Sequence, residues 1–148
     1  MNTERIKDFI GAEALAFHCS SAYAELCLDK GSVRIDNGKN VWRVVHCGKI
    51  VASTRDLYIY CYDSYPGEYH GIADDLELDN IELEDMDSTD EYNDIVYERL
   101  EAHRDKRLSE CAELLEGRKV VKIEESTSGD ATIALSGDIT IEIFRVAN

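Results

Sequence analysis

The stretch Cys111–Ile141, CAELLEGRKVVKIEESTSGDATIALSGDITI, predicts the central pattern of the fold. Its apolar residues begin at helical spacing and end at Leu115, two positions before Gly117. Glycine readily takes the left-handed conformation that ends a helix. Apolar and polar residues then alternate with the period of a half-buried strand in three segments, which are marked by Val121 and Ile123, Ile133 and Leu135, and Ile139 and Ile141. The stretch therefore predicts the end of a helix followed by a three-stranded meander.

A similar pattern occurs near the N-terminus, over 6–35. Helical spacing of Ile6, Phe9 and Ile10 precedes Gly11, and alternating segments follow it. Gly31 and Gly137 each lie twenty residues after the glycine that ends the preceding helix. We therefore interpret 6–35 and 111–143 as two copies of one unit. The turn at Asp29-Lys30-Gly31 predicts a three-residue hairpin loop, and Ser136-Gly137 predicts a two-residue one.

The residues between the two units predict further strands and a long helix. Strands are expected at 41–45 and 50–52, joined around Gly48. Ser88 and Glu91 have the spacing of a capping box, and apolar residues then recur at helical spacing to Leu115. We expect one domain, 1–148, of the α+β class. A mostly antiparallel, curved β-sheet would pack against one long helix, about 90–116, and a short N-terminal helix.

The net charge of −15 comes from one window of the chain. No Lys or Arg occurs between Asp56 and Glu98, and this window contains fifteen of the 31 acidic residues. The sixteen acids that remain balance the sixteen bases. The window repels nucleic acid and anionic membranes and attracts basic partners, so we expect no direct nucleic-acid or membrane binding.

The composition indicates a cytoplasmic protein. No apolar stretch is long enough for a transmembrane helix, and the N-terminus, with Glu4 and Asp8, lacks the apolar core of a signal peptide. Five cysteines without a CxxC pair argue against a disulfide framework. The sequence does not define the oligomeric state.

Two His-Cys pairs are candidates for a metal site or an enzyme. His18-Cys19 and His46-Cys47 could supply four ligands for zinc if their strands were neighbours. Adjacent strand residues point to opposite faces, however, which argues against convergence. No phosphate loop, HExxH or GxSxG motif is present, and no local pattern selects a cysteine nucleophile. We therefore assign no catalytic residue, no metal ligand and no cofactor.

The acidic insertion, 63–94, is the predicted interaction site. Its carboxylates alternate with apolar residues, which suits docking onto a basic, partly apolar surface. Tyr58, Tyr60 and Tyr62 precede it, and they fit either an interface or the edge of a core. The predicted partner-binding residues are Asp63, Tyr65, Glu68, Tyr69, Asp74, Asp75, Glu77, Asp79, Glu82, Glu84, Asp85, Asp87, Asp90 and Glu91.

About half of the chain carries a resemblance to known proteins. The segments 115–123 and 133–141, with Trp42-Arg43-Val44 and 48–53, resemble a pattern of small bacterial proteins. Many of these are grouped with immunity proteins of polymorphic-toxin and contact-dependent-inhibition systems. The resemblance transfers no functional residue.

Three hypotheses follow from the charge and the resemblance. The first is a non-catalytic immunity protein that neutralises a basic, nuclease-like toxin with its acidic surface. The second is a phage anti-defence protein that mimics nucleic acid. The third is a metal-binding protein or enzyme that uses His18, Cys19, His46 and Cys47.

Overall fold

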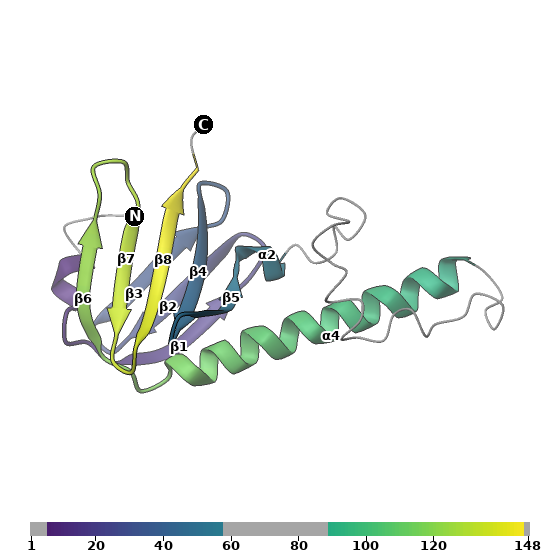
Figure 1. The fold of residues 1–148 in the computed structure, drawn as a ribbon, viewed down its shortest axis with the longest axis horizontal. Helices are drawn as coiled ribbons and strands as arrows, with labels where there is room; N and C mark the ends of the chain where they lie inside the picture. Colours follow the sequence, from purple (N-terminus) through teal and green to yellow (C-terminus); the bar gives the residue numbers. More distant parts are fainter. Residues whose placement is uncertain (1–5, 58–88, 147–148) are drawn as a thin grey trace. The chain divides into compact units, whose positions relative to one another are not determined.

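The structure is a computed structural model that describes residues 6–57 and 89–146, with side chains in the long helix described from Glu98 onward. The chain divides into two compact units, one formed by Met1–Leu57 with Arg107–Asn148 and the other by Tyr58–Lys106. All the strands of Figure 1 belong to the first unit. The acidic insertion, 63–94, lies within the second unit.

Two antiparallel sheets form the first unit, where the sequence predicted a single curved sheet. One sheet has the strand order β1 (Ala14–Cys19), β2 (Tyr23–Leu28), β3 (Gly31–Asp36). The other has the order β5 (Lys49–Ser53), β4 (Asn40–His46), β8 (Ile139–Arg145), β7 (Ala131–Leu135), β6 (Val120–Glu125). The α+β class is confirmed.

The helices are one long element and two short ones. The long helix α4 (Thr89–Leu115) agrees closely with the predicted 90–116. The expected N-terminal helix appears in the described residues only as the 3-10 turn η1 (Lys7–Phe9), and α2 (Thr54–Leu57) follows β5. Among the helices of the described segments, none has the length and apolarity that crossing a membrane requires.

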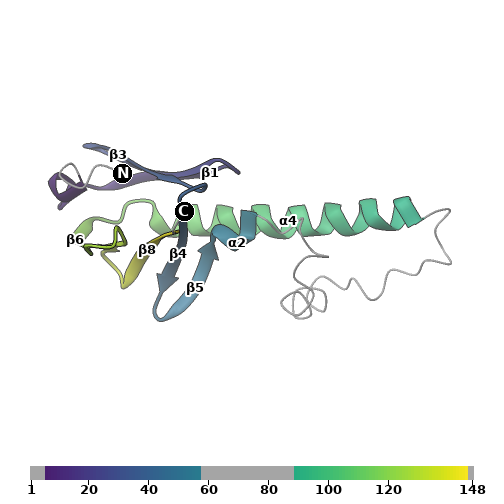
Figure 2. The ribbon, with the colours of Figure 1, turned by 90° about the horizontal axis from the view of Figure 1, so that it is seen from above.

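The apolar core lies between the two sheets, which Figure 2 shows almost edge-on. Alternate residues are buried in β2, β3, β4, β7 and β8, such as Leu26 in β2 and Ile141 in β8. The last turns of α4 add Cys111 and Leu115 to the same cluster. Each fully buried Leu or Ile contributes roughly 1.5–3 kcal/mol. The predicted alternation identifies the buried face correctly in these strands, but not in β1 and β6, where a register shift buries Ala14 and Val120 and leaves Leu15 and Val121 exposed.

The starts of β1 and β6 are joined by reciprocal backbone hydrogen bonds. Gly11 N–H donates to Val120 O at 2.7 Å, and Gly117 N–H donates to Ala14 O at 2.8 Å. Ala14 N–H donates to Arg118 O at 2.7 Å, and Val120 N–H donates to Ala12 O at 2.9 Å. The bonds form two matching pairs. Adding 106 to the residue number on the 11–14 side, and subtracting 106 from the number on the 117–120 side, turns each bond into the other member of its pair. The isolated bridge between Glu13 and Lys119 lies at the centre of this pattern.

The two hairpin loops have lengths opposite to those predicted. Leu28 pairs with Gly31, which leaves a two-residue loop, and Leu135 pairs with Ile139, which leaves three residues. Gly31 is required by the approach of Phe9, because a Cβ at this position would lie 2.9 Å from the Phe9 ring. In the second loop Gly137 and Asp138 both have positive φ, 86° and 59°. The first prediction was wrong because Gly31 begins β3 instead of ending the loop, and the second because Asp138 also belongs to the loop.

A buried polar contact fixes the corner between β3 and β4. Trp42 Nε1 donates to Asn37 Oδ1 at 3.1 Å, and Asn37 Nδ2 donates to Ser20 O at 2.9 Å. The Phe17 ring meets Trp42 edge-on, with centroids 5.3 Å apart. Asn37 therefore satisfies the indole and links it to the β1–β2 turn at the point where the chain crosses between sheets.

We predict that Asn37→Ala lowers the free energy of unfolding by about 2 kcal/mol, because it leaves a buried indole N–H without an acceptor. Asn40→Ala is the matched control, since its amide makes only an exposed bond to Asp36 O. Urea unfolding followed by the fluorescence of Trp42, the only tryptophan, measures both variants. Equal losses in the two variants would contradict the proposed role of Asn37.

Candidate functional site

Most of the predicted partner-binding residues cannot be placed, because they lie outside the described residues. These are Asp63, Tyr65, Glu68, Tyr69, Asp74, Asp75, Glu77, Asp79, Glu82, Glu84, Asp85 and Asp87. Asp90 and Glu91 lie in the first turns of α4, where only the backbone is described. Tyr58, Tyr60, Tyr62 and the capping residue Ser88 also fall outside the described segments. The predicted site therefore stays a prediction.

An ion pair lies close to the point where the acidic window begins. Asp56 in α2 is 8% exposed and accepts from Arg107 Nε at 2.9 Å and from Ser53 N–H at 2.8 Å. Both partners belong to the first unit, although Arg107 lies in α4. Asp56 is therefore neutralised within the scaffold, and fourteen acids of the window are left for a surface role.

Thr54 attaches the same short helix to the sheet. Trp42 N–H donates to Thr54 Oγ1 at 2.6 Å, and the Thr54 hydroxyl donates back to Trp42 O at 3.1 Å. Together with the Asp56 ion pair, this exchange holds α2 against β4 and the last turns of α4. These contacts fix the end of the first described segment at Leu57.

The signal for the ion pair was present in the sequence. Arg107 occupies a position on the apolar stripe of the predicted helix, between His103 and Cys111. A charged residue at such a position requires a partner of opposite charge. The sequence did not indicate which acid supplies it, because Asp56 is fifty-one residues away.

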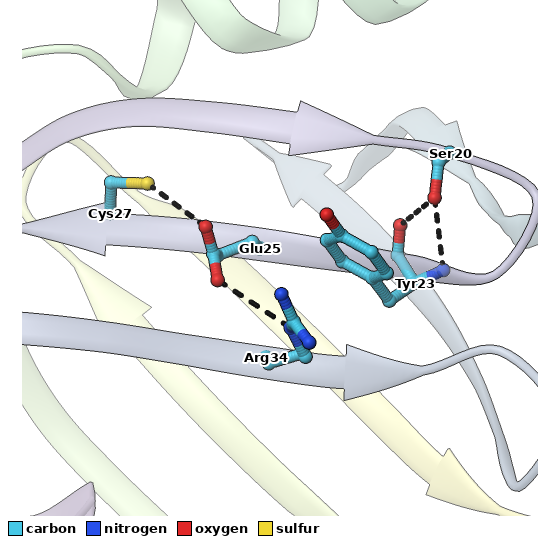
Figure 3. A network of polar contacts seen from close by, with 5 residues as sticks. All are labelled: Ser20, Tyr23, Glu25, Cys27 and Arg34. Carbon is cyan, nitrogen blue, oxygen red and sulfur yellow. Dashed lines mark hydrogen bonds and ion pairs between the residues drawn. The ribbon is translucent and has the colours of Figure 1, made fainter.

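A second group of polar side chains lies on the outer face of the three-stranded sheet (Figure 3). Arg34 Nε lies 3.6 Å from Glu25 Oε2, and the guanidinium stacks over Tyr23, 3.9 Å from the ring centroid. Cys27 Sγ donates to Glu25 Oε1 at 3.6 Å, and Ser20 Oγ accepts from Tyr23 N–H at 3.2 Å. These contacts hold Arg34 along the middle strand. The sequence analysis did not identify this network.

The pKa values of three thiols, those of Cys19, Cys27 and Cys111, are raised. Burial raises the pKa of Cys19 to about 12, with a further contribution from Cys111, and burial with the charge of Asp56 raises that of Cys111 to about 12. Burial and then the neighbouring Glu25 raise the pKa of Cys27. A nucleophilic cysteine needs the opposite shift, so these three thiols suit packing.

The proposed His-Cys metal site does not assemble. His18 and Cys19 end β1 in one sheet, whereas His46 and Cys47 lie at the end of β4 in the other, so the strands are not neighbours. Cys19 faces the core, and His18 lies on the outer face opposite Glu25. Across residues 6–57 and 89–146, no group of three His, Cys, Asp or Glu side chains is placed to hold a metal.

Comparisons with known proteins do not assign a function. No family model matches the chain, and neither a curated protein nor a solved structure is similar to it. The resemblance to immunity proteins therefore stays a prediction. The function has to be inferred from charge, burial and geometry.

We predict that Asp56→Ala lowers the free energy of unfolding by about 2 kcal/mol, because Arg107 and the Ser53 N–H lose their acceptor in a largely buried place. The control is Asp105→Ala, which removes an exposed ion pair with Arg104 and should have little effect. Chemical denaturation measures both. An Asp56→Ala protein as stable as the control would show that α2 is held by other contacts.

We predict that cysteine reactivity follows burial. In a Cys61→Ser background, Cys47, which is exposed, should react rapidly with a thiol reagent, whereas Cys19 and Cys111 should react only at the rate of unfolding. Since their folded pKa values exceed the usual 9, the unfolded chain loses these protons first, and stability should fall as the pH rises from 9 toward 12. Rapid labelling of Cys111 in the native protein would contradict the buried assignment.

Proposed function

We propose that this protein is a non-catalytic inhibitor of the immunity type, which binds a basic protein in the cytoplasm through its acidic segment, 63–94. The observation that carries the proposal is the run of acids without a single base between Asp56 and Glu98. A nuclease toxin binds phosphate with a cationic cleft, and carboxylates can occupy such a cleft in place of the nucleic acid. Charge complementarity of this kind accelerates association and gives specificity.

The distribution of charge along the sequence supports this proposal, because the surplus acids fall within one segment. Outside the window, acids and bases are equal in number. Asp56, the first acid of the window, forms an ion pair with Arg107, so the surplus charge lies beyond it. Recognition by charge requires no catalytic group, and the thiols of Cys19 and Cys111, which pack in the core cluster, suit a structural role.

We also infer that the two helix-and-meander units are copies of one ancestral unit. The reciprocal hydrogen bonds between 11–14 and 117–120 support this inference. The β1–β2 pairing shifts register between Ala14 and Ala16, and the β6–β7 pairing shifts at the corresponding place, between Val120 and Lys122. In this interpretation the acidic segment is an insertion between two halves of a duplicated scaffold.

We predict that neutralising the insertion weakens binding far more than neutralising the scaffold. The test variant replaces Asp74, Asp75, Glu77, Asp79, Glu82 and Glu84 with Asn or Gln. The matched control makes the same change at six exposed scaffold acids, namely Asp8, Glu110, Glu113, Glu116, Glu124 and Asp138. Both variants change the net charge equally, so a difference between them reports on location.

The measurement is binding to, and inhibition of, a purified basic nuclease domain encoded beside this chain, at two salt concentrations. The insertion variant should lose at least about tenfold in affinity together with much of the salt dependence, and the control less than about threefold. Equal losses would indicate general charge attraction only. Unchanged inhibition by the insertion variant would refute the proposal.

A further inference from the structure

The outer edge of β3 is an unpaired strand edge in the described structure. Within residues 6–57 and 89–146, β3 pairs with β2 alone. Its six residues contain no proline and no register shift. In contrast, the pairings β1–β2, β4–β5 and β6–β7 each contain a register shift. Bulges and prolines are common devices by which edge strands avoid pairing with other chains, and β3 lacks both.

The backbone groups of this edge point outward at alternate residues. Asn37 N–H donates to Ala22 O at 3.0 Å, so this position, one beyond the strand, belongs to a hydrogen-bonded pair. Along an antiparallel ladder, hydrogen-bonded residue pairs alternate with non-hydrogen-bonded pairs. In a non-hydrogen-bonded pair, the backbone N–H and C=O groups point away from the partner strand. The N–H and C=O groups of Ser32, Arg34 and Asp36 therefore face the free edge. Asp36 O also lies on this side, but it already accepts from Lys39 N–H and from Asn40 Nδ2, both at 3.1 Å, so the backbone groups of Ser32 and Arg34 are the ones left for pairing.

The counterpart of this edge in the second meander is already occupied. Under the 106-residue correspondence Val33 and Ile35 match Ile139 and Ile141, and all four are buried. The outer edge of β8 pairs with β4 in an antiparallel register without a shift, from Asn40 opposite Arg145 to His46 opposite Ile139. An edge of this geometry therefore accepts an antiparallel strand within this same protein.

We propose that the β3 edge pairs with the β3 edge of a second copy of this chain, which forms an antiparallel homodimer with a continuous six-stranded sheet. The pairing register is centred on Val33. This register places Ser32 opposite Arg34, and it brings Lys30, the second residue of the β2–β3 loop, opposite Asp36 of the other copy, twice by symmetry. The Lys30–Asp36 pairs supply attraction between opposite charges.

Other symmetric registers are less favourable. Facing residues must point to the same side of the sheet, so the centre falls on a residue. A centre on Arg34 would place two guanidinium groups opposite each other. A centre on Ile35 would place Arg34 opposite Asp36, but it would leave Gly31, Ser32 and Val33 facing the turn at 37–39. The contacts of Arg34 with Glu25 and Tyr23 also lie along the outer face and leave the backbone edge free. Only the Val33 register uses the whole strand.

The test is sedimentation velocity on the full chain from micromolar to millimolar concentration. The wild type should dimerise reversibly. Lys30→Asp and Asp36→Lys should each weaken the dimer about tenfold, because each creates two pairs of like charge, and the double exchange should restore it. Ser32→Pro removes an outward N–H and should abolish pairing in a folded monomer. Circular dichroism and Trp42 fluorescence confirm folding of every variant.

Each other outcome overturns the proposal. A wild type that is monomeric throughout, with rapid amide exchange in β3, would show an unused edge. A monomer with protected β3 amides would show that another part of the same chain covers it. If the β3 amides became protected from hydrogen exchange only after a basic protein was added, the β3 edge would be the binding site of that protein. If the dimer formed with unchanged affinity in the Lys30→Asp, Asp36→Lys and Ser32→Pro variants, its interface would lie elsewhere.

Discussion

The reciprocal hydrogen bonds between 11–14 and 117–120 are the constraint on which the first unit depends. They join the beginning of one meander to the beginning of the other, more than a hundred residues later. Such long-range pairing carries a large loop-closure entropy, which local contacts cannot offset early in folding. The apolar residues of both sheets make it favourable, because closing this seam brings Phe17, Leu26, Ile133 and Ile141 into one core.

Buried polar contacts fix the other corners of the first unit, where the described chain changes direction. The chain leaves the three-stranded sheet at Asn37, crosses to the other sheet at Trp42 and extends it with β4 and β5. Thr54 and Asp56 then hold α2, and Arg107 lies where α4 enters the first unit. The buried polar bonds thus concentrate at the corners where the backbone changes direction, as expected for groups that cannot reach water.

Local patterns in the sequence predicted the elements but not their partners. Helical spacing gave α4 to within one residue at each end, and Gly48 marked the turn between β4 and β5. Alternation identifies the buried face of a strand, but it does not state which strand lies beside it, so two sheets were predicted as one. The Asn37–Trp42 corner and the Asp56–Arg107 pair join residues whose side chains have no local signature. The predicted binding residues Asp63–Asp87 lie outside the described segments.

The separation of charge from core has a thermodynamic consequence that favours an interaction role. The stability of the first unit comes from apolar burial, backbone ladders and one partly buried ion pair, which depend weakly on ionic strength. The fourteen remaining acids of the window repel one another, and this repulsion depends strongly on salt. If these acids were spread through the strands, the same repulsion would act on the core. Concentrating them in one segment of the sequence confines the repulsion to that segment, and in the proposed interaction a cationic partner would relieve it.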